Sequence, residues 1–331
     1  MYKLGDQIDA RGLRQLVGMA ARRIRPLVRV TPLEYSAWLS DMLGCNVFLK
    51  LENMQITGSF KARGAASKLL SLRQDQRRNG VVTASTGNHA LAVAHMAEKL
   101  SIGATIFLTE DAAPQKVAAL RRYPVTLRFA CLDCALTEQE ARKEATRTGS
   151  VYISPYNDLE VIAGQGTVAV ELERELGRVD YLFAAVGGGG LVAGSAGYLK
   201  GRRKAVQAVG CLPSNSPTMY ECIRAGRIVA VPVYPTLSDA TAGGIEPGSI
   251  TFPLCQKLVD QWVLVSEEEI AEAIRSVFRE HRLVVEGAAG VAVAGALKYL
   301  SAVHPPKEAN AVVIVCGGNI AVDRFQEIVC R

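Results

Sequence analysis

Lys61 lies in a glycine-containing segment, residues 57–64, that follows a strand predicted at 47–51. Gly58 permits an unusual turn there, Ser59 is placed to cap the following helix, and Lys61 falls in the first turn of that helix. Near the positive end of a helix dipole the ammonium form is disfavoured, so we expect a lowered pKa for Lys61. A neutral amine is the form that a nucleophilic lysine needs. An isolated lysine would more simply be a solvated surface residue, so the interpretation depends on what accompanies it.

A second segment combines hydroxyls, a glycine and the start of a helix, directly after a strand predicted at 81–84. Its residues are Ser85, Thr86, Gly87, Asn88 and His89. The exposed N–H groups at the start of a helix, together with these hydroxyls, are suited to bind a carboxylate or a phosphate. The alternative is structural, because Ser85 or Thr86 could equally cap the helix. The segment alone leaves both interpretations open.

A third segment lies between a strand predicted at 181–186 and a helix of small residues, and consists of Gly187, Gly188, Gly189, Gly190 and Leu191. Successive amides without side chains offer donors that fit closely around a phosphate. Gly188, Gly190 and Ala193 also match a loose dinucleotide-binding pattern, G-x-G-x-x-A. Such a fold needs an acidic residue about 20 positions further on to bind the ribose. Residues 181–220 contain none, so the segment predicts a phosphate loop rather than the dinucleotide site of an oxidoreductase.

The fourth segment, Cys316-Gly317-Gly318-Asn319, follows a strand predicted at 312–315. Ligands of open α/β sheets collect at the carboxyl ends of the strands, so all four segments are expected to converge on one crevice. A nucleophilic lysine, an anion loop and a phosphate loop together indicate pyridoxal 5'-phosphate, a phosphorylated aldehyde, as cofactor. A non-catalytic anion-binding module is the alternative, and it gives no reason for the lysine.

The elements that must position these segments alternate between short apolar strands and helices. Further strands are predicted at 105–108, 125–129, 151–154 and 206–209, and helices at 62–72, 89–100, 138–148 and 266–280. A capping box of Ser266 and Glu269 opens the last of these helices. The alternation predicts an α/β fold with parallel sheets covered on both faces.

A chain of 331 residues is long enough for two domains. The turn at 154–158 is the predicted boundary between them. We therefore expect a large domain built from 1–70 and 155–331, and a small inserted domain at 71–154. The crevice between the two would hold the cofactor, and movement of the small domain would close it on the substrate.

Composition and charge exclude several classes of partner. Lys and Arg number 38 against 32 Asp and Glu, a net charge of +6, and the positive charges are dispersed among carboxylates, so no nucleic-acid partner is expected. The uncharged stretch 181–199 is interpreted as strand, loop and helix rather than as a membrane span, because the glycine run would break a spanning helix. Residues 1–6 lack the apolar core of a signal peptide, and the eight cysteines are dispersed. We therefore expect a cytoplasmic protein with free thiols.

Metal-ligating side chains show no pattern that predicts a metal site. Cys131 and Cys134 form a C-x-x-C pair, but no second pair accompanies it. The four histidines also lack the spacing of metal ligands. We expect no bound metal.

These motifs occur in the order found in a known family. The chain resembles the fold-type II pyridoxal phosphate enzymes, in particular the threonine/serine dehydratase (ammonia-lyase) and serine racemase group. The resemblance extends over nearly the whole chain, from Thr31-Pro32-Leu33 through Lys50-Leu51-Glu52-Asn53 and Gly58-Ser59-Phe60-Lys61 to Cys316-Gly317-Gly318-Asn319. Residues 235–245 are also similar to hydroxyectoine-utilisation dehydratases. The resemblance implies a homodimer.

The resemblance also implies a role for each matched residue. Lys61 would form the Schiff base with the cofactor and later act as general base. The ring would be contacted by Phe60, by Asn88 at its hydroxyl, by Glu286, and by Cys316 at its nitrogen. The phosphate would be held by Gly187, Gly188, Gly189, Gly190 and Leu191, and the substrate carboxylate by Ser85, Thr86, Gly87, Asn88 and His89. A neutral thiol at Cys316 is no strong acid, so the ring nitrogen would stay largely unprotonated, which favours β-elimination.

The function implied by the resemblance is a dehydratase that converts a 3-hydroxy amino acid, L-threonine or L-serine first, to a 2-oxo acid and ammonia. Hydroxyaspartate, phenylserine and a hydroxyectoine-derived amino acid remain alternatives as substrates. A racemase is the alternative activity: Thr86 stands where serine racemases place the serine that serves the opposite face of the substrate, and it keeps the hydroxyl. The divalent-metal loop of the racemases has carboxylates where this chain has Leu212 and Thr218, so that metal site is expected to be absent.

Overall fold

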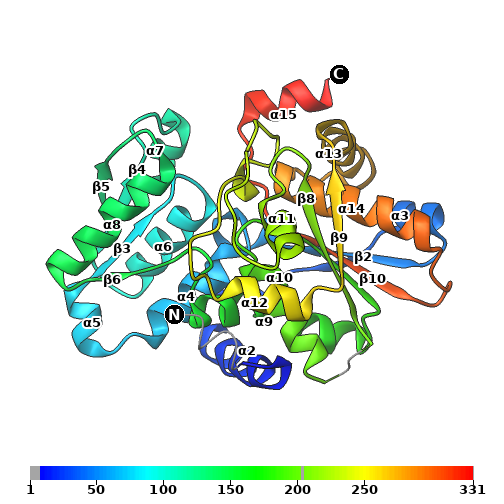
Figure 1. Cartoon of the computed structure of the whole chain (residues 1–331), viewed down its shortest axis with the longest axis horizontal. Helices are drawn as coiled ribbons and strands as arrows, with labels where there is room; N and C mark the ends of the chain where they lie inside the picture. Colours follow the sequence, from blue (N-terminus) through cyan, green and yellow to red (C-terminus); the bar gives the residue numbers. More distant parts are fainter. Residues whose placement is uncertain (1–7, 203–204, 331) are drawn as a thin grey trace.

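Two sheets, parallel except for one edge strand, form the framework of the protein. The computed structural model describes residues 8–202 and 205–330. The segment 1–6, from which we expect no export signal, lies outside the described residues. Within the described part the sheets have six and four strands. The predicted α/β architecture is therefore built around two separate sheets, which lie on opposite sides of the molecule (Figure 1).

The larger sheet is built from both ends of the chain. In spatial order its strands are β1 (Leu33–Tyr35), β2 (Asn46–Leu51), β10 (Asn310–Val315), β7 (Tyr181–Ala185), β8 (Gln207–Pro213) and β9 (Gln261–Val265). Strand β1 pairs antiparallel to β2, and the other pairs are parallel. Parallel central strands must be buried on both faces, and β10 is an almost unbroken apolar run for that reason.

The smaller sheet is formed by one continuous stretch of chain. Its strands, in spatial order, are β5 (Thr126–Phe129), β4 (Ala104–Leu108), β3 (Val81–Ala84) and β6 (Val151–Tyr152), and all pairs are parallel. These strands occupy the cyan and green part of the molecule in Figure 1. All four fall within 71–154, the range proposed for the small domain.

Helices cover both sheets. Those of the larger body are α2 (Ala10–Ile24), α3 (Ala37–Leu43), α4 (Lys61–Ser71), α9 (Leu159–Leu176), α10 (Gly190–Lys200), α11 (Thr218–Ala225), α12 (Thr251–Leu258), α13 (Glu267–His281), α14 (Gly287–Val303) and α15 (Val322–Val329). The smaller sheet is accompanied by α5 (Gln74–Asn79), α6 (Asn88–Lys99), α7 (Pro114–Leu120) and α8 (Cys134–Thr148). Short 3-10 turns are η1 (Glu52–Met54), η2 (Ile56–Gly58) and η3 (Asp239–Thr241).

Helix α4 joins the two bodies, since it packs against α9 on one side and α6 on the other. Glycines let these helices approach closely. A Cβ on Gly164 of α9 would lie 2.7 Å from the Cα of Gly64 in α4, and one on Gly194 of α10 would lie 2.3 Å from the carbonyl oxygen of Ile162. This close stack of α4, α9 and α10 fixes the start of α4 relative to the start of α10.

All eight predicted strands correspond to strands of the structure, with ends that differ by a few residues. Two strands were not predicted: β1 has only three residues, and β9 is a half-buried edge strand beginning with glutamine. The capping box of Ser266 and Glu269 is present at the start of α13. The stretch 181–199 forms β7, a loop and α10, as predicted, and no helix in the described part is long and apolar enough to cross a membrane.

Candidate active site

The four predicted segments meet at a cavity of about 330 Å³. Its walls include every residue that the sequence assigned to the site: Phe60, Lys61, Ser85, Thr86, Gly87, Asn88, His89, Gly187, Gly188, Gly189, Gly190, Leu191, Glu286 and Cys316. The segments follow β2, β3, β7 and β10, so the carboxyl ends of strands from both sheets supply the walls. Convergence on one crevice, which the sequence predicted, is what the structure shows.

Lys61 is the first residue of α4, and its amine lies inside the cavity wall. Its Nζ donates a hydrogen bond to the carbonyl oxygen of Pro155 at 2.9 Å and lies 5.3 Å from the centre of the Phe60 ring. Burial lowers the pKa of Lys61 to about 8, although Cys316 and Glu286 oppose this shift. The direction agrees with the prediction, and the main cause is the loss of hydration on burial.

Ser59 does not cap α4, so this prediction is wrong. The N-cap of α4 is Phe60, without a side-chain hydrogen bond. Ser59 is extended (φ −161°, ψ 160°) and forms an antiparallel bridge with Gly317, while the amide of Phe60 donates to the carbonyl of Cys316 at 3.0 Å. The backbone before Lys61 is thus tied to the fourth segment instead of turning back on the helix.

The second segment opens α6 without a side-chain cap. The N-cap is Gly87, and the hydroxyl of Ser85 accepts a hydrogen bond from the Gly87 amide at 3.2 Å, inside the turn. Capping of α6 by Ser85 or Thr86 is therefore not what these hydroxyls do. Gly87, Asn88 and His89, which open α6, line the cavity, so the N-terminus of this helix lies at the cavity wall without a side-chain cap, which supports the binding interpretation.

Asn88, Glu286 and Asn319 form a polar cluster in the cavity wall. The amide of Asn88 donates to both carboxylate oxygens of Glu286 at 2.9 Å, and Asn319 donates from its side chain to Asn88 at 2.7 Å and from its backbone to Glu286 at 3.2 Å. Burial raises the pKa of Glu286 to about 6, partly offset by the Asn88 hydrogen bond. No role of its own was predicted for Asn319, although its place in the fourth segment was the available signal.

His89 and Cys316 are both held uncharged. The carbonyl oxygen of Ile153 accepts a hydrogen bond from the His89 Nε2–H at 3.1 Å, and burial, with Lys61 nearby, lowers the pKa of His89 to about 3. Burial also raises the pKa of the Cys316 thiol well above its usual value. The neutral thiol predicted at Cys316 is therefore present, and any part of His89 in binding a carboxylate falls to its backbone N–H rather than to its imidazole.

Neighbouring groups pack closely against the glycine loop, so no side chain fits on it. A ligand can therefore contact the loop only through its backbone amides. Helix α10 begins at Gly190, and its N-cap Gly189 has φ +84°, a conformation that favours glycine. A Cβ on Gly188 would lie 2.2 Å from the Tyr156 ring. Bare N–H groups at the positive end of a helix suit a phosphate, so the residues present fit the phosphate of pyridoxal phosphate.

Tyr156 and Gln165 are cavity residues that the sequence analysis missed. Tyr156 packs on Gly188, and its hydroxyl accepts a hydrogen bond from the Glu246 amide at 3.0 Å. Gln165 of α9 is buried, and its side-chain oxygen accepts from the amide of Gly64 at 3.1 Å. In the sequence, Tyr156 appeared only as part of the predicted domain-boundary turn at 154–158. No local pattern pointed to Gln165 as a site residue.

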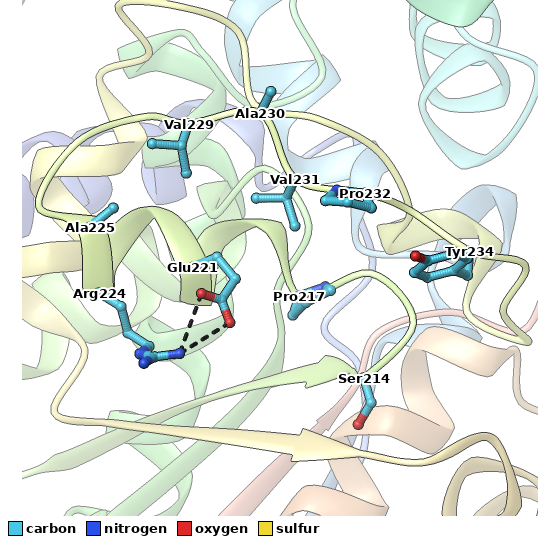
Figure 2. A pocket seen from close by; sticks show the side chains of 10 residues that line it. All are labelled: Ser214, Pro217, Glu221, Arg224, Ala225, Val229, Ala230, Val231, Pro232 and Tyr234. Atoms are coloured by element: carbon cyan, nitrogen blue, oxygen red, sulfur yellow. Dashed lines mark hydrogen bonds and ion pairs between the residues drawn. The ribbon is translucent and has the colours of Figure 1, made fainter.

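A second hollow, larger and more open at about 620 Å³, lies beside α11 (Figure 2). Its charged side chains, Glu221 and Arg224, pair with each other along the helix. None of the predicted site residues lines it, and we assign no chemistry to it. Near it, Leu212 is buried in β8 and Thr218 donates to the carbonyl of Gly243, and no group of three potential metal ligands occurs in the described residues.

A buried lysine between an anion loop and a phosphate loop, on an α/β framework, defines an enzyme that binds a phosphorylated carbonyl cofactor. Residues 24–317 match the family described as "Pyridoxal-phosphate dependent enzyme". The L-threonine ammonia-lyase of Thermotoga maritima is 39% identical over 94% of this chain and 76% of its own. The catabolic L-threonine dehydratase of Staphylococcus aureus is 35% identical over 94% of this chain and 90% of its own.

Solved structures agree with these relatives. Threonine deaminase isoform 2 from Solanum lycopersicum superposes with a TM-score of 0.91 and 31% identity, covering 97% of this chain and 93% of that chain. Maize serine racemase superposes with a TM-score of 0.89 and 29% identity, covering 95% of each chain. The protein belongs to the pyridoxal-phosphate dependent enzyme family, and pyridoxal 5'-phosphate is its cofactor. The predicted family, fold class and cofactor are confirmed.

Proposed function

We propose that this enzyme is an ammonia-lyase that converts a 3-hydroxy amino acid, L-threonine or L-serine first, to a 2-oxo acid and ammonia. The observation that carries the proposal is the Lys61 amine, with its pKa lowered to about 8, in a cavity between the anion loop and the phosphate loop. The similarity to proteins named L-threonine ammonia-lyase and L-threonine dehydratase supports the same reaction and the same first substrate.

Each wall of the cavity has a separate task in this reaction. The amides of the loop from Gly187 to Leu191 would hold the cofactor phosphate, and the Lys61 amine would hold its carbonyl group. When bound, the cofactor withdraws electrons from the substrate Cα. The first N–H groups of α6 bind the substrate carboxylate, which orients the Cα–H bond toward the Lys61 amine. The neutral Lys61 amine would accept the α-proton as general base.

Cys316 and Glu286 shape the electrostatics of the ring site. The uncharged Cys316 thiol would stand at the ring nitrogen and, as a weak acid, would leave that nitrogen largely unprotonated, a setting that favours elimination over chemistry needing a long-lived carbanion. Asn88 is oriented by its hydrogen bonds with Glu286 and Asn319, and it would contact the ring hydroxyl. These assignments predict a neutral thiol at the ring nitrogen, and a carboxylate at Glu286 that is ionised above about pH 6.

The decisive experiment is 2-oxo acid release from a panel of 3-hydroxy amino acids by the holoenzyme. The panel contains L-threonine, L-serine, 3-hydroxyaspartate and phenylserine, and the alternative hydroxyectoine-derived substrate. Release from L-threonine or L-serine with equimolar ammonia is the expected result. D-serine formed from L-serine without 2-oxo acid would instead identify a racemase, with Thr86 as the residue on the opposite face of the substrate.

Three further assignments complete the proposal. We propose the large domain as 1–70 and 155–331 and the small domain as 71–154, with closure of the small domain on the substrate. A cytoplasmic location fits the eight cysteines, all of them free. The homodimer implied by the resemblance stays a prediction, and light scattering on the purified holoenzyme tests it.

A further inference from the structure

An ion pair lies at the mouth of the cavity and is not used by the reaction described above. Lys116 belongs to the first turn of α7, beside the smaller sheet, and Asp239 begins η3 of the larger body. The Nζ of Lys116 lies 2.9 Å from a carboxylate oxygen of Asp239, and both residues line the cavity. The pair therefore bridges the entrance from one body of the protein to the other.

The other charged side chains of the cavity leave this pair as the one that can act on the charge of a substrate side chain. Among the described lining residues, the carboxylates and ammonium groups belong to Lys61, Lys116, Asp239 and Glu286. Lys61 is engaged by the cofactor, and His89 is neutral at ordinary pH. Asp239 and Lys116 shift the pKa of Glu286 in opposite directions, so both lie close enough to act on the polar cluster of the site. The cation left for a substrate side chain is thus Lys116, and Asp239 already neutralises it.

We propose that the Lys116–Asp239 pair selects the charge of the substrate side chain. A second carboxylate on the substrate would meet the like charge of Asp239 while the ammonium of Lys116 is occupied, so acidic amino acids are disfavoured. A neutral side chain, such as that of threonine, meets no such repulsion. The inference rests on the proposed function in one respect: it names neutral 3-hydroxy amino acids as the substrate class and excludes 3-hydroxyaspartate.

Removing the Asp239 carboxylate should therefore shift the binding preference from neutral toward acidic side chains, rather than simply weaken binding of every amino acid. In Asp239→Asn the ammonium of Lys116 is unmasked, and the repulsive charge is gone. A substrate side-chain carboxylate then gains affinity relative to a neutral side chain by about tenfold. Because the Lys116 and Asp239 side chains are 39% and 65% exposed, salt screens this effect, and the gain shrinks at high ionic strength.

The test measures binding to the holoenzyme without depending on elimination. L-aspartate and L-2-aminobutyrate carry no β-hydroxyl, and their dissociation constants are read from the change in cofactor absorbance. The ratio of the two constants is compared in the wild type, in Asp239→Asn and in the double variant Lys116→Met/Asp239→Asn. The matched control is Glu246→Gln, which breaks the Arg142–Glu246 pair at 2.6 Å between the same two bodies without touching the cavity.

The expected result is a shift of about tenfold toward L-aspartate in Asp239→Asn, which the double variant loses and Glu246→Gln does not show. An unchanged ratio in Asp239→Asn overturns the inference. The same shift in the double variant or in Glu246→Gln also overturns it, because loosening of the two bodies, not charge, would then be the cause. If the ratio shifts but no 2-oxo acid forms from the panel, the inference stands and the proposed function fails. If L-threonine is turned over and the ratio of dissociation constants does not change, the proposed function stands and the inference fails.

Discussion

Lys61 and Arg63 lie two residues apart at the start of α4, yet their surroundings have opposite effects on their charge. The amine of Lys61 has a carbonyl oxygen, that of Pro155, as its hydrogen-bond partner. The guanidinium of Arg63 is buried and forms two-pronged contacts with both Glu52 and Glu171, with distances of 2.7 to 3.0 Å. Burial would lower the pKa of Arg63, but the two carboxylates raise it instead. For Lys61 burial prevails, and the pKa falls to about 8.

The comparison shows that partners, not burial alone, separate a reactive group from a structural one. Around Arg63, Lys50 also contacts Glu171 at 2.8 Å, so the buried part of the cluster holds two cations and two carboxylates. Burial alone would raise the pKa of Glu171, and Arg63 and Lys50 lower it overall. Such a cluster has no group free for chemistry. Lys61 lacks a direct carboxylate partner among the described residues, and its amine is left able to lose its proton.

Lys61→Ala makes the largest expected difference. Both the covalent hold on the cofactor and the general base disappear, so turnover should fall by about a thousandfold or more and the absorbance of the bound cofactor should be lost. Thermal unfolding of the cofactor-free variant should change little, because the amine has no ion-pair partner there. Lys68→Ala, in the same helix but outside the cavity, is the control and should stay active. Turnover retained in Lys61→Ala would refute the mechanism.

Arg63→Met should have the opposite effect to Lys61→Ala, with a loss of stability as its primary consequence. It leaves Glu52 and Glu171 buried without their guanidinium, which should lower the free energy of unfolding by about 3–5 kcal/mol. Denaturant or thermal unfolding measures this, with Arg63→Lys as a variant that keeps the charge and loses the two-pronged geometry. Wild-type stability in Arg63→Met would show that the cluster is dispensable for the fold.

The pH dependence of cofactor uptake separates Lys61 from an ordinary lysine. Attachment needs the neutral amine, whose fraction falls about tenfold for each pH unit below its pKa. With a pKa of about 8, the uptake rate of the cofactor-free protein should rise up to about pH 8 and then level off. Stopped-flow absorbance follows the reaction. A rate that keeps rising toward pH 10 would show that the cavity does not lower the pKa.

The sequence was sufficient for eight of the ten strands of the described residues, for the first turn of α4 and for the convergence of the four segments. Apolar runs predicted the eight strands, and a lysine after Gly58 predicted the first turn of α4. Convergence of the four segments followed from the rule that parallel strands gather ligands at their carboxyl ends. These inferences held because each depends on local pattern and on topology rather than on individual contacts.

The partners of the buried charges could not be predicted in the same way. Arg63 and Glu171 are separated by 108 positions, and Lys61 and the Pro155 carbonyl by 94. No local pattern joins such pairs. For the same reason the cap assigned to Ser59 was wrong, since the bridge to Gly317 competes with it, and the lowered pKa of Lys61 was expected for another cause.

The smallest expected effect lies at the edge of the Arg63 cluster and tests how far its burial extends. Glu175 contacts Lys50 at 3.0 Å, but its side chain is 36% exposed. In Glu175→Gln, Lys50 keeps Glu171 at 2.8 Å and the carbonyl of Thr31 at 2.7 Å, so the free energy of unfolding should fall by less than about 1 kcal/mol. Glu171→Gln is the matched comparison and should cost about 3 kcal/mol, because it leaves two buried cations short of a carboxylate. Equal losses in the two variants would mean that water does not reach Glu175 in solution, and that the balanced, unreactive region around Arg63 extends out to the surface.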